Sequence, residues 1–203
     1  MDKLRRGIGL LLIFLGIAII TTVVYKKIDT ARKQKAIVEI FENGISEGTL
    51  TEGGLPEGEE KVNLDGINGY KPIAIMEIPS IKLSQALVEG ISDDVLRYFL
   101  GHFVDSAAPG EKGNFAVAGH RVSDYTDAFI NLYKVKPGDE VIVKTTDKKY
   151  TYVVEDNFIV EPEDVKVLED TKEATMTLVT CTVGARQRVI VKGKLISEES
   201  LGN

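Results

Sequence analysis

The sequence has few of the side chains from which disulfides and zinc sites are built. It contains one cysteine and two histidines in 203 residues. A lone thiol excludes an intrachain disulfide framework and any metal site made of paired cysteines. His102 and His120 stand apart without a ligand pattern around them, which argues against zinc. We therefore predict no metal and no other cofactor.

Positive charge is also in short supply. Lys and Arg together number 25 against 31 Asp and Glu, so the formal net charge is −6. After the N-terminal region no strongly basic patch alternates with aromatic residues, and we expect no nucleic acid partner. An acidic run between Glu161 and Asp170 raises the question of calcium. Its residues lack an obvious ligand spacing, so calcium is not predicted.

The N-terminal region does contain a long apolar run, from Gly7 to Tyr25. Its 19 residues suffice to cross a membrane as a helix. No small-residue cleavage site precedes Lys26 and Lys27, which argues against a removed signal peptide, and charges on both flanks argue against a buried core helix. Basic residues lie on both sides of the run, and their count does not favour an external C-terminus.

The composition changes twice after this run. Residues from Asp29 to about Phe41 can be helical, and Asn43 to Gly69 is rich in Gly and Glu, as in a solvated linker. The alternative is an arm that folds over the following domain. We predict a tail and transmembrane anchor over 1–28, a stalk over 29–69 and one folded domain over 70–203.

Short strand-like segments separated by turn residues fill the last part of the chain. Asp93 to Phe99 interrupts them as a short helix. Regular strand spacing favours a closed β-barrel, because closure removes exposed edges. The expected strands are Ile73–Ile78, Gln85–Val88, Asn114–Ala118, Glu140–Thr145, Lys149–Glu155, Ala174–Cys181 and Arg188–Ile196.

Cys181 has two interpretations. Free cysteine is often a small buried hydrophobe, and the alternating residues before it fit a half-buried strand. The alternative is a nucleophile, because Cys181 ends one strand, Arg188 opens the next, and His120 follows a third. A thiol with a base nearby is the arrangement of a cysteine enzyme.

The order of these motifs resembles the sortases, the cysteine transpeptidases of Gram-positive bacteria. The resemblance runs from about 73 to 195. The motifs that carry it are Ile78-Pro79, Gly101-His102-Phe103, Pro109-Gly110-Glu111-Lys112-Gly113-Asn114, Ala118-Gly119-His120, Thr177-Leu178-Val179-Thr180-Cys181 and the Arg188 that opens the last strand. The resemblance implies a mainly β fold, an eight-stranded closed barrel with short helices.

The resemblance also implies a reaction. A sortase cuts an LPxTG-type sorting signal between Thr and Gly through a thioacyl-enzyme, and transfers the surface protein to a peptidoglycan amine. Cys181 would be the nucleophile, His120 the proton donor and Arg188 the stabiliser of the oxyanion. His102 is expected to be structural. Rivals for the arginine role, expected to be weaker, are Arg186 and Arg121.

The remaining expectations follow from the same resemblance. Ala118 and Thr180 would line the substrate pocket, with core packing as the alternative for both. The partners would be LPxTG-type surface proteins and an amine of a peptidoglycan precursor or cross-bridge. A single-pass helix would anchor the chain in the cell membrane, with the catalytic domain on the extracellular side. Class D fits best and class A next, since the segment from Asn157 to Glu173 is short. The alternatives are a hydrolytic cysteine protease and a non-enzymatic barrel that binds a wall component.

Overall fold

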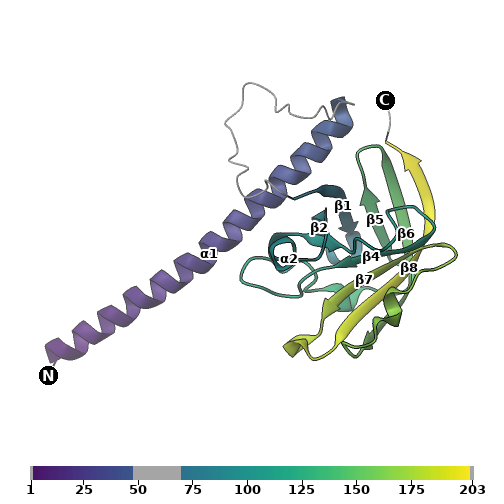
Figure 1. The fold of residues 1–203 in the computed structure, drawn as a ribbon. Coiled ribbons are helices and arrows are strands. Elements are labelled where there is room, and N and C mark those ends of the chain that lie inside the picture. Colours follow the sequence, from purple (N-terminus) through teal and green to yellow (C-terminus); the bar gives the residue numbers. More distant parts are fainter. Residues whose placement is uncertain (1, 48–69, 202–203) are drawn as a thin grey trace.

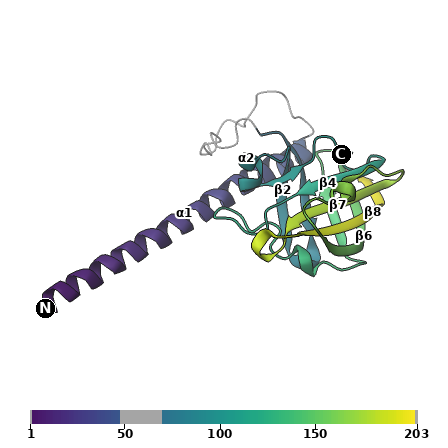
Figure 2. The same ribbon diagram turned by 60° about the horizontal axis from the view of Figure 1, so that its bottom comes forward.

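A closed β-barrel forms the body of the protein, and one long helix runs along its side (Figure 1). The computed structural model describes residues 2–47 and 70–201. The long helix is α1, Asp2–Glu47. Its N-terminal part extends away from the barrel, and its C-terminal part lies beside β1, β2 and α2 (Figures 1 and 2). The predicted linker falls largely on residues 48–69, outside the described ranges.

The barrel of the described residues contains eight strands in the order β1-β2-β3-β4-β7-β8-β6-β5, and β5 pairs with β1 to close it. Most neighbours are antiparallel, but β2 with β3 and β4 with β7 are parallel. This confirms the predicted fold class. The strands are β1 Pro72–Ile78, β2 Leu83–Glu89, β3 Leu100–His102, β4 Gly113–Ala118, β5 Glu140–Lys144, β6 Lys148–Val160, β7 Ala174–Cys181 and β8 Arg188–Ser200.

Short helices join the strands. Helix α2, Asp93–Tyr98, begins at Ser92, whose hydroxyl accepts a hydrogen bond from the Val95 amide at 3.4 Å. Its first turn contains Asp93 and Asp94, whose negative charges interact favourably with the positive end of the helix dipole. The 3-10 helices are η2 Pro79–Ile81, η3 Leu132–Lys134, η4 Val165–Leu168 and η5 Val183–Ala185.

The barrel interior is filled by the inward side chains of alternating strand residues. Phe115 and Val117 of β4 and Met176 and Leu178 of β7 are all fully buried in this core. Their neighbours along each strand therefore point to the outer face, because side chains alternate across a strand. This alternation decides which residues of β4, β7 and β8 face the outside of the barrel.

The largest differences from the sequence prediction are at β3 and β6. Strand β3, which ends at His102, was not among the expected strands, because its three residues are too few to show an alternating pattern. Strand β6 continues to Val160, beyond the predicted end at Glu155. Its pairing with β8 shifts register after Thr151 and again after Val154, and such bulges interrupt the alternation on which the prediction relied.

A second apolar cluster lies outside the barrel, where α1 and α2 pack on β1 and β2. Its buried members are Ile75, Ala86, Val88, Val95 and Phe99, and Val38 of α1 packs against them. Helix α1 also contains a segment, Arg6–Lys35, that is long and apolar enough to cross a membrane. One continuous helix, α1, therefore contains both a segment long enough to span a membrane and a segment that packs on the barrel.

Candidate active site

The parallel pairing of β4 and β7 brings two distant segments together at one end of the barrel. Ala118 lies opposite Val179, and the Gly119 amide donates to the Val179 carbonyl at 3.1 Å. His120 and Cys181 each lie two residues beyond this pair, so the two residues are at the same end of the barrel. Sixty residues lie between His120 and Cys181 in the sequence, but the β4–β7 register places them at neighbouring strand ends.

The connection between β7 and β8 adds the arginine. It is a tight turn over η5, in which the Thr182 amide donates to the Gln187 carbonyl at 2.9 Å. Gly184 has a positive φ of 78°, a conformation that glycine adopts without steric cost. The turn brings Cys181 and Arg188 directly opposite each other across the β7–β8 pair.

Cys181 is partly exposed at this end of the barrel. Met176 and Leu178 point into the core, so the alternation along β7 directs Cys181 outward, and it is half-buried. Ala118, which ends β4, is half-buried too and alternates with the inward Val117. The first interpretation of the sequence, a cysteine buried in the hydrophobic core, is therefore not what the structure shows.

The Arg188 guanidinium is held by its own turn. Its Nη1 donates to the carbonyl oxygens of Ala185 and Gln187, both at 3.2 Å. Arg188 is half-buried, whereas Arg186 is exposed. Of the two, Arg188 is thus the one fixed beside the thiol-bearing strand end.

Gly119 and Thr180 support the residues that follow them. The Thr180 hydroxyl donates to the Gly119 carbonyl at 2.8 Å, and Thr180 is only 3% exposed. A Cβ atom on Gly119 would lie 2.6 Å from side-chain carbons of both Leu100 and Phe129, so only glycine fits there. Substrate contact by Thr180 stays a prediction; its hydroxyl is already engaged in joining β7 to the segment before His120.

The other histidine occupies a different environment. His102 is 4% exposed, and its ring is hydrogen-bonded to Glu89, Ser106 and the Ala107 carbonyl at 3.0–3.2 Å. These contacts tie β3 to β2 and to the following loop. They agree with the structural role expected for His102.

The acidic residues after His120, Asp124 and Asp127, form ion pairs with α1 and none with His120. Asp124 pairs with Lys26 of α1 at 3.1 Å, and Asp127 pairs with Lys27 at 2.5 Å. Neither pair could be predicted from local sequence, because the partners lie about a hundred positions apart. Both carboxylates are thereby engaged by the helix that precedes the barrel.

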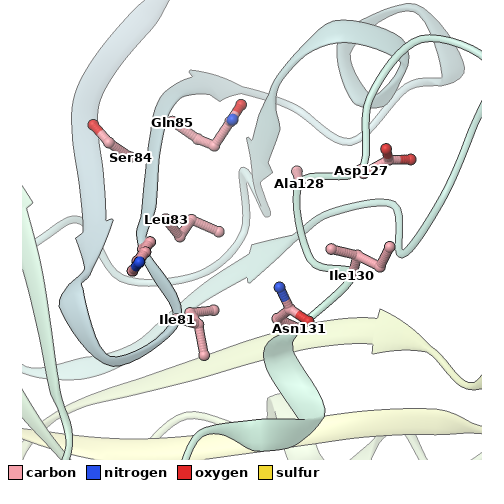
Figure 3. Close-up of a pocket in the computed structure, with 9 residues that line it drawn as sticks. Ile81, Leu83, Ser84, Gln85, Asp127, Ala128, Ile130 and Asn131 are labelled. Carbon is pink, nitrogen blue, oxygen red and sulfur yellow. The ribbon is translucent and has the colours of Figure 1, made fainter.

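A small cavity lies beside the segment that follows His120 (Figure 3). It measures about 170 Å³ and lies between η2–β2 and residues 127–131. Gln85 and Asp127 line it, and each has one buried side-chain oxygen, Oε1 and Oδ1 respectively, without a hydrogen-bond partner in the described structure. It does not include Cys181, His120 or Arg188.

The connection from β6 to β7 flanks the outer face of β4 and β7. It contains η4, whose Val167 carbonyl accepts hydrogen bonds from Asn114 of β4 and Thr177 of β7, both at 3.3 Å. As expected from its length, it holds no long inserted helix. Among the described residues no cluster of three or more His, Cys, Asp or Glu could hold a metal.

Comparison with known proteins matches this architecture to one family. The sortase domain model matches residues 76–196. Sortase D of Bacillus subtilis is 27% identical over 204 residues, which cover 96% of this chain and 100% of the relative. Sortase SrtE1 of Streptomyces coelicolor is 32% identical over 143 residues, 62% of this chain but only 40% of that relative's length.

Solved structures agree. The Clostridium perfringens sortase D5 transpeptidase superposes with a TM-score of 0.62 at 32% identity, covering 85% of this chain and 99% of that one. The match includes sequence as well as fold, since its identity is well above the level at which only the fold is shared.

Proposed function

The chain belongs to the sortase family of cysteine transpeptidases, and from this premise we propose the reaction that its barrel carries out. It cleaves an LPxTG-type sorting signal between Thr and Gly and transfers the surface protein to an amine of the peptidoglycan. The observation that carries the proposal is the convergence of three strand ends, with Cys181 opposite Arg188 and beside the segment that leads to His120.

The first half of the reaction forms a thioester. The Cys181 thiolate attacks the threonine carbonyl carbon, and the carbonyl oxygen becomes an oxyanion beside the Arg188 guanidinium. As the C–N bond to glycine breaks, the His120 imidazolium gives its proton to the leaving amine. The Cys181 sulfur is then acylated by the threonine carbonyl as a thioester, and His120 is neutral.

The second half restores the enzyme. The acceptor amine attacks the thioester carbon, His120 takes the proton that the amine loses, and the Cys181 thiolate leaves. The site starts and ends with the same charges. No metal or organic cofactor enters either step.

The outer face of β4 and β7 is the proposed binding surface for the sorting signal. Ala118 lies on it and offers little side-chain volume next to the nucleophile, so a peptide can approach. Thr180, buried beneath it, contributes through the Gly119 carbonyl. The β6–β7 connection would form one wall.

The setting of the enzyme completes the proposal. The apolar segment of α1 anchors the chain in the cell membrane, and the barrel lies on the extracellular side, where sorting signals and peptidoglycan amines occur. The match along the whole of sortase D favours class D. The acceptor is a precursor or a cross-bridge amine.

One experiment tests the proposal. The full chain in detergent is incubated with an LPxTG-type peptide, with and without an amine such as triglycine, and the products are identified by mass spectrometry. We expect a peptide that ends at threonine and is joined to the added amine. A hydrolysed product in both cases would favour the protease alternative, and an intact peptide would contradict the proposal.

A further inference from the structure

One face of α1 lies against the barrel just beyond the apolar run. The residues of this face recur every three or four positions, which is the spacing of neighbours on one side of a helix. Thr30, in the middle, is 4% exposed. The contacting side chains are those of Lys26, Lys27, Lys33, Gln34 and Val38. The helix is thus docked over about three turns.

Gln34 fixes the helix to the outside of the sheet. Its Oε1 accepts from the Ala86 amide at 2.9 Å, and its Nε2 donates to the Tyr98 carbonyl. A side-chain amide that satisfies both β2 and α2 sets the position of α1 along its axis. Val38, one turn further, packs on the second apolar cluster.

The membrane-proximal end of the same face holds the segment after His120. Lys26 pairs with Asp124 at 3.1 Å, and its ammonium lies 5.0 Å from the centre of the Tyr125 ring. Lys27 pairs with Asp127 at 2.5 Å. These contacts come immediately after Tyr25, the last residue of the apolar run.

The clamped segment is continuous with the catalytic histidine. Asp127 begins a turn in which its carbonyl accepts from the Ile130 amide at 3.1 Å. Within that turn the Phe129 amide donates to the His120 carbonyl at 3.0 Å. The buried Phe129 ring also packs directly against Gly119. A displacement of Asp127 would therefore reach His120 through Phe129.

We propose that the part of α1 between Lys26 and Val38 is a positioning element of the active site, in which Lys27, through Asp127 and the Phe129 turn, fixes the orientation of His120. The inference rests on the proposed function of His120. Lys27 touches neither substrate nor reacting atoms, so it is a positioning residue. The anchor is then a part of the catalytic unit, and the active-site end of the barrel is held near the bilayer surface.

Activity should depend on this clamp more than stability does. A half-exposed ion pair usually contributes little to folding. A small misplacement of a catalytic group, in contrast, can lower the rate by as much as ~10²-fold. Loss of the clamp should therefore lower kcat and leave thermal unfolding nearly unchanged.

The test is a double-mutant cycle in the full chain, reconstituted in lipid nanodiscs. The variants are Lys27→Met, Asp127→Asn and the two combined. Lys35→Met is the matched control, because Lys35 pairs at 3.2 Å with Glu39 on the helix itself. We expect each single variant and the double variant to lose about tenfold in kcat, with KM changed by less than about twofold. The control should keep its rate. Independent, additive losses from the two single changes would overturn the proposal.

A second readout needs no sorting peptide. Hydrogen exchange of residues 121–129 should accelerate in Lys27→Met and stay unchanged in Lys35→Met. The rate at which Cys181, the only thiol of the chain, is alkylated at a fixed pH should change in Lys27→Met, because the proposed site pairs this thiol with the His120 ring that the clamp orients. Unchanged exchange and alkylation in Lys27→Met would contradict the clamp. A wild-type chain that leaves peptide uncut would instead contradict the proposed function, while these two measurements still judge the clamp.

Discussion

The hydroxyl of Thr180 donates a 2.8 Å hydrogen bond to the carbonyl of Gly119, joining the residue before the cysteine to the residue before the histidine. Both partners are buried, so water cannot replace the bond easily. Because each partner is covalently linked to a proposed catalytic residue, this bond couples the separation of Cys181 and His120 to the β4–β7 pairing.

Replacing Thr180 by valine removes this bond at nearly constant volume. The Gly119 carbonyl is then left buried without its partner, which costs about 1–3 kcal/mol of unfolding free energy. We expect kcat/KM to fall about tenfold because the His120 segment can shift. Thr177→Val is the matched control, since Thr177 is buried on the same strand and bonds to Asn114 at 2.7 Å. In thermal melts, Thr177→Val should be destabilised about as much as the Thr180→Val variant. In kinetic assays, it should lose less activity. Equal losses of activity would remove the special role of Thr180.

The two histidines should differ in kind. His120→Ala should lower kcat by ~10²-fold or more, as expected for a lost general acid, and leave the melting temperature nearly unchanged. His102→Ala should do the reverse, because it leaves the partners of a buried ring unsatisfied, at about 1–3 kcal/mol. Assays below the melting transition of each variant separate the two effects. A greater kinetic loss at His102 would show that the histidine roles are exchanged.

Arg188→Lys should be a poor enzyme although it keeps the charge. The planar guanidinium of Arg188 can donate to an oxyanion while its Nη1 donates to the carbonyls of Ala185 and Gln187. The lysine ammonium lacks this planar set of donors. Loss of one oxyanion donor costs ~10²–10³-fold in rate. Arg186→Ala, at an exposed position, should cost far less. Near-normal kcat for Arg188→Lys, or a larger loss at Arg186, would exclude Arg188 from the site.

Alkaline pH should weaken the barrel through Tyr152. Burial raises the pKa of Tyr152 to about 12, although the hydrogen bond that its hydroxyl accepts from the Gly110 amide lowers it in part. An unfolded tyrosine titrates near ~10, so the folded state holds the proton more tightly. This contribution to stability is complete below pH ~10 and is lost as the pH rises toward 12. The melting temperature of Tyr152→Phe should therefore fall less steeply across this range than that of the wild type; parallel falls would contradict the expectation.

The sequence was sufficient for most strands, because β1, β4, β7 and β8 have alternating or β-branched residues over at least six positions. It was insufficient for β3, which has three residues and exists through its pairing with β2 and β4. Local pattern cannot reveal a strand whose stability comes from its neighbours.

The site shows the same division. The motifs around His120, Cys181 and Arg188 indicated which residues belong together, but their meeting depends on the parallel β4–β7 register. The docking of α1 was not predictable from periodicity, because its contact face is largely polar. Lys27 and Gln34 resemble solvated linker residues until their partners, Asp127 and the Ala86 amide, are known.

The thioacyl-enzyme is the central feature of the proposed reaction, and intact-mass spectrometry tests it most directly. The full chain is mixed with an LPxTG-type peptide without an amine, quenched in acid within seconds, and compared with Cys181→Ala treated in the same way. We expect an adduct with the mass of the peptide cut after threonine, located on Cys181 by fragmentation and absent from the variant, which should not turn over. Cleavage by Cys181→Ala, or an adduct on any other residue, would contradict Cys181 as the nucleophile.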